Sequence, residues 1–466
     1  MAIKSPVLIL VALIAISLSC SDDFLNDNEK TRYTATDPLI ISTKSAENII
    51  NLSIPAGKNR NFHISTYPRW LQFESLQGTF QEGTASLLFT FVHPGYEPEA
   101  GYFAADLVVT IENAGLFCIK VICGNFGSVG DKIIGNVTGI AGTVTDAAYH
   151  KASDQLILAT ESPNQLIFFD AVSEKKTTVT LEKRPKCIDI SESENLVAIG
   201  FSVAELALYG LETRALIRSF PLDCIPHDLA LGSNGWCYIS PAGQGNQALR
   251  SLRLSNGAIS KREPVNSHFY SNSLVRKVTA KPLLMITRTT VIPSGLLLYD
   301  ITGGVPNDTI NYWPDDLYDL WPANEGNRFI TGTGKVCQMP AYTPVVSAPA
   351  DLGVYGDLQP HQPFVNHVDE SVVKNCFFVS ERNTLYLSQN QNSPGIIEQF
   401  DRNSLSVQNS WQPSSSVISN NSTLIVAFNA VNYAFANRTG TKLLAVRSIA
   451  PDFGINQWSV EIFKID

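Results

Sequence analysis

From about residue 144 onward, apolar and polar positions repeat in one pattern: three short apolar strands separated by small polar turns. The pattern occurs seven times, most clearly where Ser153, Ser193 and Ser233 fall 40 residues apart, each just before a strand. A repeat of 40 to 57 residues made of strands is typical of a β-propeller blade. The sequence therefore predicts an all-β chain that contains a seven-bladed β-propeller.

The copies also predict how the blades are built and closed. Their second strands are expected to begin at Leu156, Leu196, Trp236, Leu283, Arg328, Leu385 and Leu443. Asp170, Asp300 and Asp401 end third strands, and we expect their carboxylates to bond backbone N–H groups two residues on. A fourth strand follows in copies one to six. The seventh copy lacks one, so we expect the segment from Lys132 to Ile140 to complete that blade and close the ring.

Residues 38–126 show a different pattern, in which alternating apolar segments are separated by Gly, Pro and Asn turns. This predicts a small antiparallel, immunoglobulin-like β-sandwich. The box Pro68-Arg69-Trp70-Leu71, with Gly78 and a penultimate strand from Tyr102 to Ile111, resembles the BACON domain of Bacteroidetes surface proteins. The resemblance implies a sandwich that often precedes carbohydrate-active modules and is proposed to contact glycans. From its apolar context alone, Trp70 is expected in the core, which would make the domain a spacer.

The first twenty residues indicate export. Lys4 precedes the apolar run from Val7 to Ile16, which is too short to span a bilayer, and small residues lead to Cys20. This pattern resembles a bacterial lipoprotein signal, although Leu18 stands two places before the cysteine instead of three. The resemblance implies lipidation of Cys20 and an outer-membrane lipoprotein at the cell surface or on the periplasmic face. Ordinary cleavage, with Cys20 a bystander, is the alternative.

These observations give an expected domain order of signal peptide (1–19), flexible tether (20–37), sandwich (38–126) and propeller (130–466). With 44% hydrophobic residues, the chain of 466 residues has enough apolar side chains for large cores. Its net charge of -9 and the lack of any Lys/Arg stripe argue against nucleic acid as a partner. Seven cysteines beyond Cys20 lie mostly in apolar strand text without zinc spacing, so we expect buried small hydrophobes. We expect a monomer without cofactor or metal.

The blade text resembles YVTN and WD-repeat-like propellers, because the pattern P-x-x-[IL]-x-[IL] opens two blades, at Pro185 to Ile190 and Pro226 to Leu231. The chain carries no Gly-rich phosphate loop between a strand and a helix, no GxSxG elbow and no HExxH motif. We therefore expect no enzymatic activity.

Loops that join consecutive blades gather on one propeller face, where concave ligand sites form. On this face we expect the candidate ligand-binding residues Tyr312, Trp313, Asp316, Tyr318, Asp319, Trp321, His227, His268, Tyr270, Arg288 and His367, together with Arg184, Lys186, His361 and Arg447. Within the segment Asn311 to Trp321, aromatic rings suited to stacking on sugars alternate with carboxylates that accept hydroxyl hydrogen bonds. Calcium binding by its aspartates, or simple packing between blades, are the alternatives.

Two insertions, residues 345–364 and 412–432, lengthen the repeat, and such insertions tend to form surface loops on binding faces. The leading hypothesis is a non-catalytic surface lipoprotein that binds a glycan or an envelope protein through the propeller face. A polysaccharide lyase or hydrolase is the first alternative, and it requires at least two of His227, His268, His367 and Asp319 to converge. A scaffold in an envelope complex is the second alternative.

Overall fold

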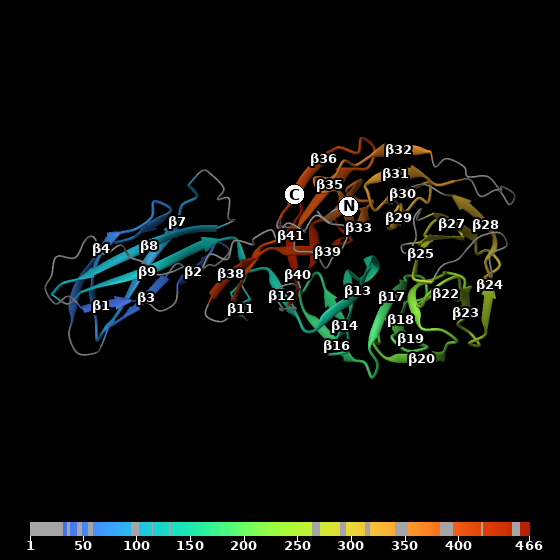
Figure 1. Cartoon of the computed structure of the whole chain (residues 1–466), viewed down its shortest axis with the longest axis horizontal. Coiled ribbons are helices and arrows are strands. Elements are labelled where there is room, and N and C mark those ends of the chain that lie inside the picture. The colour runs from blue at the N-terminus through green and yellow to red at the C-terminus, as the bar shows by residue number, and fades with distance from the viewer. Residues whose placement is uncertain are drawn as a thin grey trace, which may run out of the picture. The chain divides into compact units, whose positions relative to one another are not determined.

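The computed structural model is an all-β structure, shown in Figure 1. It describes residues 31–34, 38–43, 49–54, 59–94, 102–113, 115–129, 132–133, 135–262, 271–288, 295–312, 317–340, 353–382, 395–420, 423–449 and 457–466. No helix within these ranges has the length and apolarity needed to cross a bilayer. The chain divides into two compact units. We call Met1–Val137 with Ser414–Ala427 the sandwich unit, and Thr138–Pro413 with Phe428–Asp466 the propeller unit.

The propeller unit consists of successive four-stranded blades, which follow one another around a ring in Figure 1. Blades one to three comprise β13 (Thr143–His150), β14 (Gln155–Glu161), β15 (Gln165–Asp170) and β16 (Lys176–Thr180); β17 (Pro185–Ser191), β18 (Leu196–Phe201), β19 (Glu205–Gly210) and β20 (Leu216–Pro221); and β21 (Pro226–Leu231), β22 (Trp236–Pro241), β23 (Leu249–Arg253) and β24 (Ile259–Arg262). A 3-10 turn, η2 (Lys151–Ser153), follows β13.

The later blades keep the same strand order. Blades four to six comprise β25 (Ser273–Val278), β26 (Leu283–Arg288), β27 (Leu296–Asp300) and β28 (Asn307–Tyr312); β29 (Leu320–Pro322), β30 (Arg328–Thr331), β31 (Lys335–Gln338) and β32 (Val354–Asp357); and β33 (Phe364–Ser371), β34 (Cys376–Arg382), β35 (Ile396–Asp401) and β36 (Val407–Trp411). Blade seven contains β39 (Asn429–Ala436), β40 (Lys442–Ile449), β41 (Trp458–Lys464) and β12 (Val137–Ile140). The predicted all-β fold with a seven-bladed propeller is confirmed.

Blade seven shows how the ring closes. The C-terminal strand β41 has β12 as its outer neighbour, so a strand from before the first blade completes the last one. This confirms the predicted closure of the ring, but the closing strand is Val137–Ile140 and not the whole segment from Lys132 to Ile140. The residues Lys132–Ile133 form a separate strand, β11, that pairs with β10 (Phe126–Val129) instead. Closure of this kind gives β41 a paired outer neighbour and joins strands from both ends of the propeller sequence in one sheet.

Burial along the blades explains the sequence pattern. The middle strands are apolar runs because each blade packs between two neighbours, so both faces of β14 and β18 are buried. The outer strand β16, by contrast, is mostly exposed. The predicted turn aspartates are confirmed as well. Asp170, Asp300 and Asp401 each accept a hydrogen bond from the backbone N–H two residues on, at 2.8 to 3.0 Å.

Blade six corrects one predicted strand. Its second strand is β34, which begins at Cys376, whereas the sequence favoured the stretch that begins at Leu385. Leu385 lies outside the described residues. Both stretches are apolar enough to form a strand, but Cys376, Phe377, Phe378 and Val379 fill the core between blades and are fully buried. Packing between blades therefore selects the earlier stretch.

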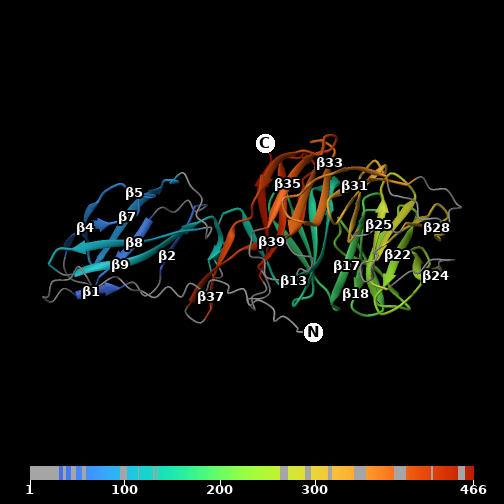
Figure 2. The ribbon, with the colours of Figure 1, turned by 45° about the horizontal axis from the view of Figure 1, so that its top comes forward.

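The sandwich unit contains two facing sheets. The larger comprises β1 (Thr31–Thr34), β9 (Gly115–Gly124), β8 (Tyr102–Ile111), β4 (Arg60–Thr66) and β6 (Gln77–Phe80), with β2 (Leu39–Ser42) also paired to β9; the smaller comprises β3 (Ile49–Ser53), β7 (Thr84–Phe91) and β5 (Leu71–Phe73). Figure 2 shows β8 and β9 running side by side. The predicted antiparallel order is wrong at one edge, because β1 and β2 pair with β9 in parallel. Part of the predicted tether thus belongs to the sheet.

The core of the sandwich unit confirms the structural interpretation of Trp70. Trp70 is only 6% exposed, and its ring centroid lies 5.9 Å from that of Phe103 and 6.2 Å from that of Phe91. Gly78 lies directly beneath Phe62, so an added Cβ would come within 2.5 Å of that ring. Trp70 therefore packs against both sheets, and Gly78 leaves room for the ring of Phe62 on the neighbouring strand of the larger sheet.

A third small sheet changes the interpretation of the second insertion. β37 (Ser415–Asn420) and β38 (Thr423–Ala427) form a hairpin, and β37 pairs with β10 in the sandwich unit. Phe126 and Val417 are buried together there, and Ser128 and Ser416 share a hydrogen bond of 2.9 Å. The prediction that this insertion forms a surface loop is wrong, because its apolar residues complete a sheet.

The described cysteines largely match the expectation of buried small hydrophobes. Cys123, Cys187, Cys237, Cys337 and Cys376 are free and buried, and Cys224 is free and half-buried. Cys118 differs, since it is disulfide-bonded. Cys20 lies outside the described residues.

Candidate binding site in the central channel

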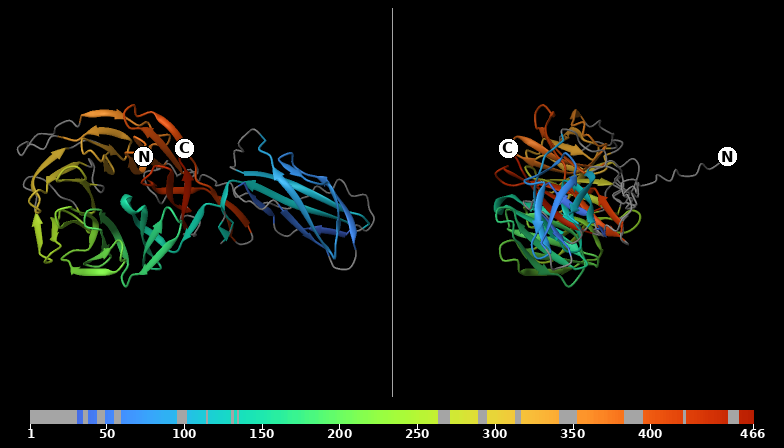
Figure 3. Two further views of the ribbon diagram at one scale, coloured as in Figure 1. Left: turned by 180° about the vertical axis from the view of Figure 1, so that it is seen from behind. Right: turned by 90° about the vertical axis from the view of Figure 1, so that its left-hand side faces the viewer.

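The inner strands of the blades, β13, β17, β21, β25, β29, β33 and β39, surround a cavity of about 2800 Å³ in the propeller unit. Figure 3 shows the same ring of blades from behind. Each inner strand is reached from the outer strand of the preceding blade, so all inner strands begin on one face. We call that end of the channel the start end and the other the finish end.

Five inner strands carry a β-bulge near the start end. The strand register shifts just before Asp146, Cys187, Asp228, His367 and Tyr433. A bulge adds one residue and re-aims the side chains that follow it. Four of these five positions, all except Cys187, hold a polar or ionisable side chain in place of the apolar side chain of an ordinary strand.

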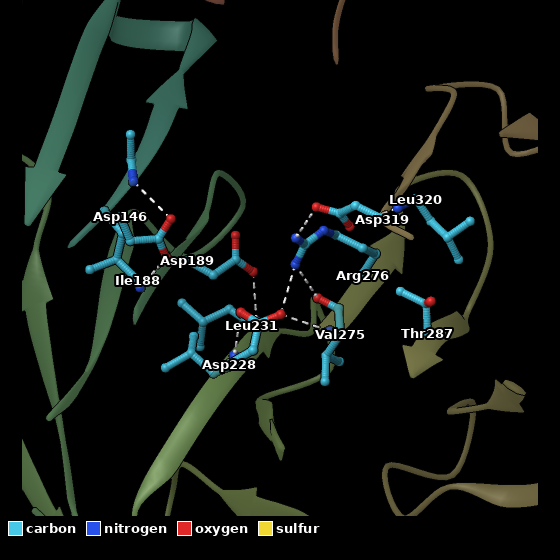
Figure 4. Close-up of polar contacts among 12 residues, drawn as sticks. Asp146, Ile188, Asp189, Asp228, Leu231, Val275, Arg276, Thr287, Asp319 and Leu320 are labelled. Atoms are coloured by element: carbon cyan, nitrogen blue, oxygen red, sulfur yellow. Dashed lines mark hydrogen bonds and ion pairs between the residues drawn. The ribbon is translucent and has the colours of Figure 1, made fainter. Parts of the chain in front are cut away.

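Aspartates of the inner strands also join neighbouring blades. Asp146 accepts a hydrogen bond from the backbone N–H of Ile188 in blade two, and Asp189 accepts one from Leu231 in blade three, both at 2.8 Å (Figure 4). The same contact, again at 2.8 Å, recurs from Asp228 to Val275 and from Asp369 to Ala436. A carboxylate that receives backbone N–H groups satisfies donors that a curved ring of strands would otherwise leave unpaired.

One arginine organises the charges near the start end. The guanidinium of Arg276 lies between two carboxylates in Figure 4, donating to Asp228 Oδ2 at 2.8 Å and to Asp319 Oδ2 at 3.1 Å. Burial alone would lower the pKa of Arg276, but Asp319, Asp228 and Asp146 raise it. Burial raises the pKa of both Asp228 and Asp319, although Arg276 opposes that shift. We call Arg276, Asp228, Asp319 and Asp146 the start-end cluster.

Asp146 is the third acid of this cluster. No basic side chain of the described residues forms an ion pair with it, and the Tyr433 hydroxyl lies 3.4 Å from its Oδ1. Burial, followed by the charge of Asp228, raises the pKa of Asp146 to about 7. The cluster thus has one base for three acids, and Asp146 gains its proton as the pH falls through about 7.

The finish end is charge-balanced. Lys277 Nζ lies 3.2 Å from Asp189 Oδ2, and Lys151 Nζ lies 2.6 Å from Asp369 Oδ2. Lys151 also donates to the carbonyl oxygen of Ala436 at 2.7 Å. We call these two contacts the finish-end pairs. Each acid here has its own lysine, so little charge is left for a ligand.

The two described histidines of the channel are neutral. His367 Nδ1 lies 3.0 Å from the Ala434 carbonyl oxygen and 3.4 Å from the Ala434 backbone nitrogen, so the backbone of blade seven fixes this side of the ring. Its ring lies 4.5 Å from that of Phe435, and burial lowers its pKa to about 3. Burial, followed by the charges of Lys186 and Arg276, lowers the pKa of His227 to about 4.

The structure brings seven of the residues predicted for this face to the cavity: Arg184, Lys186, His227, Tyr318, Asp319, Trp321 and His367. Trp321 also packs in the core between blades and is 8% exposed. For Tyr312 and Arg288 the structure describes only the backbone, at the ends of β28 and β26. Trp313, Asp316, His268 and Tyr270 lie outside the described residues.

Two residues predicted for this face, Arg447 and His361, do not line the cavity. Arg447 does not reach the cavity, because it is buried beside Glu461 at 2.8 Å on the neighbouring strand β41. His361 is exposed and lies outside the cavity lining. The sequence places both in the right part of a blade but does not show which way their side chains point.

Sequence reasoning missed several residues that line the channel: Asp146, Asp189, Asp228, Arg276 and Tyr433. A signal was present. The motif that opens blades two and three contains Asp189 in PKCIDI and Asp228 in PHDLAL. An acid inside an otherwise apolar inner strand has to find partners, and this could have identified the inter-blade contacts.

The convergence that a lyase or hydrolase would need is not seen in the described part of the channel. No hydrogen bond there joins any two of His227, His367 and Asp319. Within the same residues, no group of three or more His, Cys, Asp or Glu side chains is placed to hold a metal ion.

The sequence matches no protein-family model and no curated protein. Among solved structures, the chain is similar to Kuenenia stuttgartiensis hydrazine synthase, with a TM-score of 0.50 and 10% identity over 70% of this chain and 96% of that chain. It is also similar to the β-propeller domain of Myceliophteria thermophila Cps50 (Swd1), with a TM-score of 0.50 and 10% identity over 71% and 98% of the two chains. At this identity the likeness concerns the fold alone, that of a β-propeller.

Proposed function

We propose that the chain is a non-catalytic binding protein that holds a glycan in the central channel of its propeller. The observation that carries this proposal is the cavity of about 2800 Å³ lined by the inner strands. Sites for drug-sized molecules measure roughly 300–1,000 Å³. The channel therefore has room for a ligand of several sugar units.

The chemistry of the lining supports a sugar ligand. Trp458 and Tyr433 are half-buried and present aromatic surface to the cavity. Such rings stack on the apolar faces of pyranoses, and the free Nε2 of neutral His367 suits a sugar hydroxyl. Within the start-end cluster, and within each finish-end pair, acidic and basic side chains bond each other. This arrangement favours binding over proton-transfer chemistry.

We further propose that the protein is tethered by lipid at Cys20 to the outer membrane, facing the cell surface, with the sandwich unit as a spacer. The burial of Trp70 supports the role of spacer, because its ring is not available to a ligand. The BACON-like resemblance of this unit remains a prediction.

A polysaccharide panel tests the binding function. The soluble chain from Glu29 onward is expected to bind at least one polysaccharide without releasing reducing ends. The variant Trp458→Ala should weaken that binding by about two- to tenfold, because an aromatic stacking contact contributes about 0.5–1.5 kcal/mol. Trp411→Ala is the matched control. Trp411 lies on the outer strand β36, where it packs against Phe378 of β34, away from the cavity.

The outcomes separate the alternatives. Released sugars would indicate a lyase or hydrolase and overturn the non-catalytic function. Failure to bind any polysaccharide, together with co-purification of a defined envelope protein, would favour the scaffold.

The anchor is tested by Cys20→Ser in the full chain. The unchanged protein should fractionate with membranes and incorporate labelled fatty acid, and the variant should do neither. A lipid thioether uses the Cys20 sulfur, so a disulfide at Cys20 in the purified protein would contradict the anchor.

A further inference from the structure

The start end of the channel carries two basic side chains without an acidic partner. They are Lys186, the second residue of β17, and Arg382, the last residue of β34, and both line the cavity. No acidic side chain among the described residues forms an ion pair with either of them, whereas Arg184 pairs with Glu161. The other buried bases of the channel belong to the start-end cluster or the finish-end pairs.

The strand register places both residues at the same mouth. Arg382 pairs with Phe364, the first residue of inner strand β33, and Lys186 follows Pro185, the first residue of inner strand β17. Both side chains are half-buried. They face the channel from blades six and two, so a ligand at the start end would meet positive charge from two sides.

Arg382 has unused hydrogen-bonding capacity. Its Nε is buried and has no hydrogen-bond partner among the described residues, and burial lowers the pKa of Arg382. An unsatisfied buried donor costs free energy, which an incoming acceptor would recover. The charge of Asp319 raises the pKa of Arg382, which opposes the effect of burial. The Oδ2 of Asp319, however, already accepts a hydrogen bond from Arg276 at 3.1 Å.

His227 lies at the same mouth and adds no positive charge of its own. Besides burial, the charges of Lys186 and Arg276 keep its ring neutral. The cavity at this end therefore holds unneutralised charge on Lys186 and Arg382 beside a neutral imidazole. A neutral sugar would leave that charge unpaired, whereas an anionic group would satisfy it.

We propose that Lys186 and Arg382 bind an anionic substituent of the ligand, so that the channel prefers acidic over neutral glycans. The planar fork of arginine suits the paired oxygens of a carboxylate or a sulfate, and the lysine adds a point charge. This inference rests on the proposed glycan-binding function and specifies its ligand class. The shared chemistry is the oxyanion, which uronic acids and sulfated sugars both supply.

Calorimetry with three oligosaccharides of equal length tests the proposal: oligogalacturonate, a sulfated galactan oligomer and a neutral galactan oligomer. At least one acidic probe should bind about tenfold tighter than the neutral one, with an affinity that falls as salt rises. Arg382→Gln and Lys186→Gln should each reduce that affinity about tenfold and leave neutral-probe binding unchanged. Lys281→Gln, at an exposed lysine lining the finish end, is the matched control and should have no effect.

Each result decides one question. A preference for galacturonate over the sulfated probe identifies a carboxylate ligand, and the reverse identifies a sulfate. Equal binding of neutral and acidic probes, or undiminished binding by both variants with native circular dichroism, overturns the oxyanion site while glycan binding stands. If no polysaccharide of the wider panel binds, the proposed function and this inference both fail.

Discussion

The two ends of the propeller channel neutralise their buried aspartates in different ways. At the finish end, Lys277 and Lys151 each neutralise one aspartate. At the start end, a single guanidinium serves Asp228 and Asp319, while Asp146 has no base and gains its proton as the pH falls through about 7. A buried charge is tolerated only when it is paired or neutralised. The finish end is therefore built for stability, and the start end retains charge and a proton that a ligand or a change of pH can affect.

The largest expected effect comes from removing the base of the start-end cluster. Arg276→Met should lower the free energy of unfolding by about 3 kcal/mol, because it leaves buried acids without their cation. Urea denaturation followed by near-UV circular dichroism measures this loss. The control is Arg253→Met, an exposed arginine that lies over the Trp236 ring outside the channel, for which we expect little change. A loss no greater than that of the control would show that the cluster does not hold the blades together.

A smaller effect is expected at the finish end. Lys277→Met leaves Asp189 without its lysine, but this carboxylate still accepts the N–H of Leu231 and faces no second acid in the finish-end pairs. The expected loss is roughly 1–2 kcal/mol, because the pair is partly exposed and contains only one acid. The same urea denaturation serves as the measurement. A cost equal to or above that of Arg276→Met would remove the distinction between the two ends.

The repeat pattern predicted the fold well because buried strands and turns differ in their local composition. Apolar runs such as Leu156 to Ala159 mark middle strands, and aspartates such as Asp170 mark turns. The channel was harder to predict. Whether Asp228 faces the channel depends on a bulge, and its partner Arg276 is 48 residues away in the next blade. Periodicity alone does not encode either fact.

The prediction of a surface loop at the second insertion was wrong for a related reason. The hairpin of β37 and β38 pairs with β10, which lies almost 300 residues earlier in the chain. Local sequence shows that Val417 is apolar but not which distant edge it will cover.

The smallest effect concerns the proton on Asp146 and sharpens the contrast between the ends. In the folded state the pKa of Asp146 is about 7, whereas an unfolded aspartate has a pKa of roughly 3.9. The folded protein therefore holds a proton that the unfolded chain has already released. The resulting stability is fully present at low pH and is lost as pH rises through the folded pKa.

Asp146→Asn should remove this dependence, because its carboxamide does not titrate while its oxygen still accepts the N–H of Ile188. Between pH 6 and 8, the unchanged protein should lose about 1 kcal/mol of unfolding free energy relative to the variant. Urea denaturation at several pH values measures the difference, and histidines such as His367 cancel because both proteins contain them. Asp189 has its own lysine, so between pH 6 and 8 the unfolding free energy of Asp189→Asn should change with pH as it does in the unchanged protein. Parallel profiles for the unchanged protein and Asp146→Asn would mean that Asp146 is ionised throughout and that the start end is as balanced as the finish end.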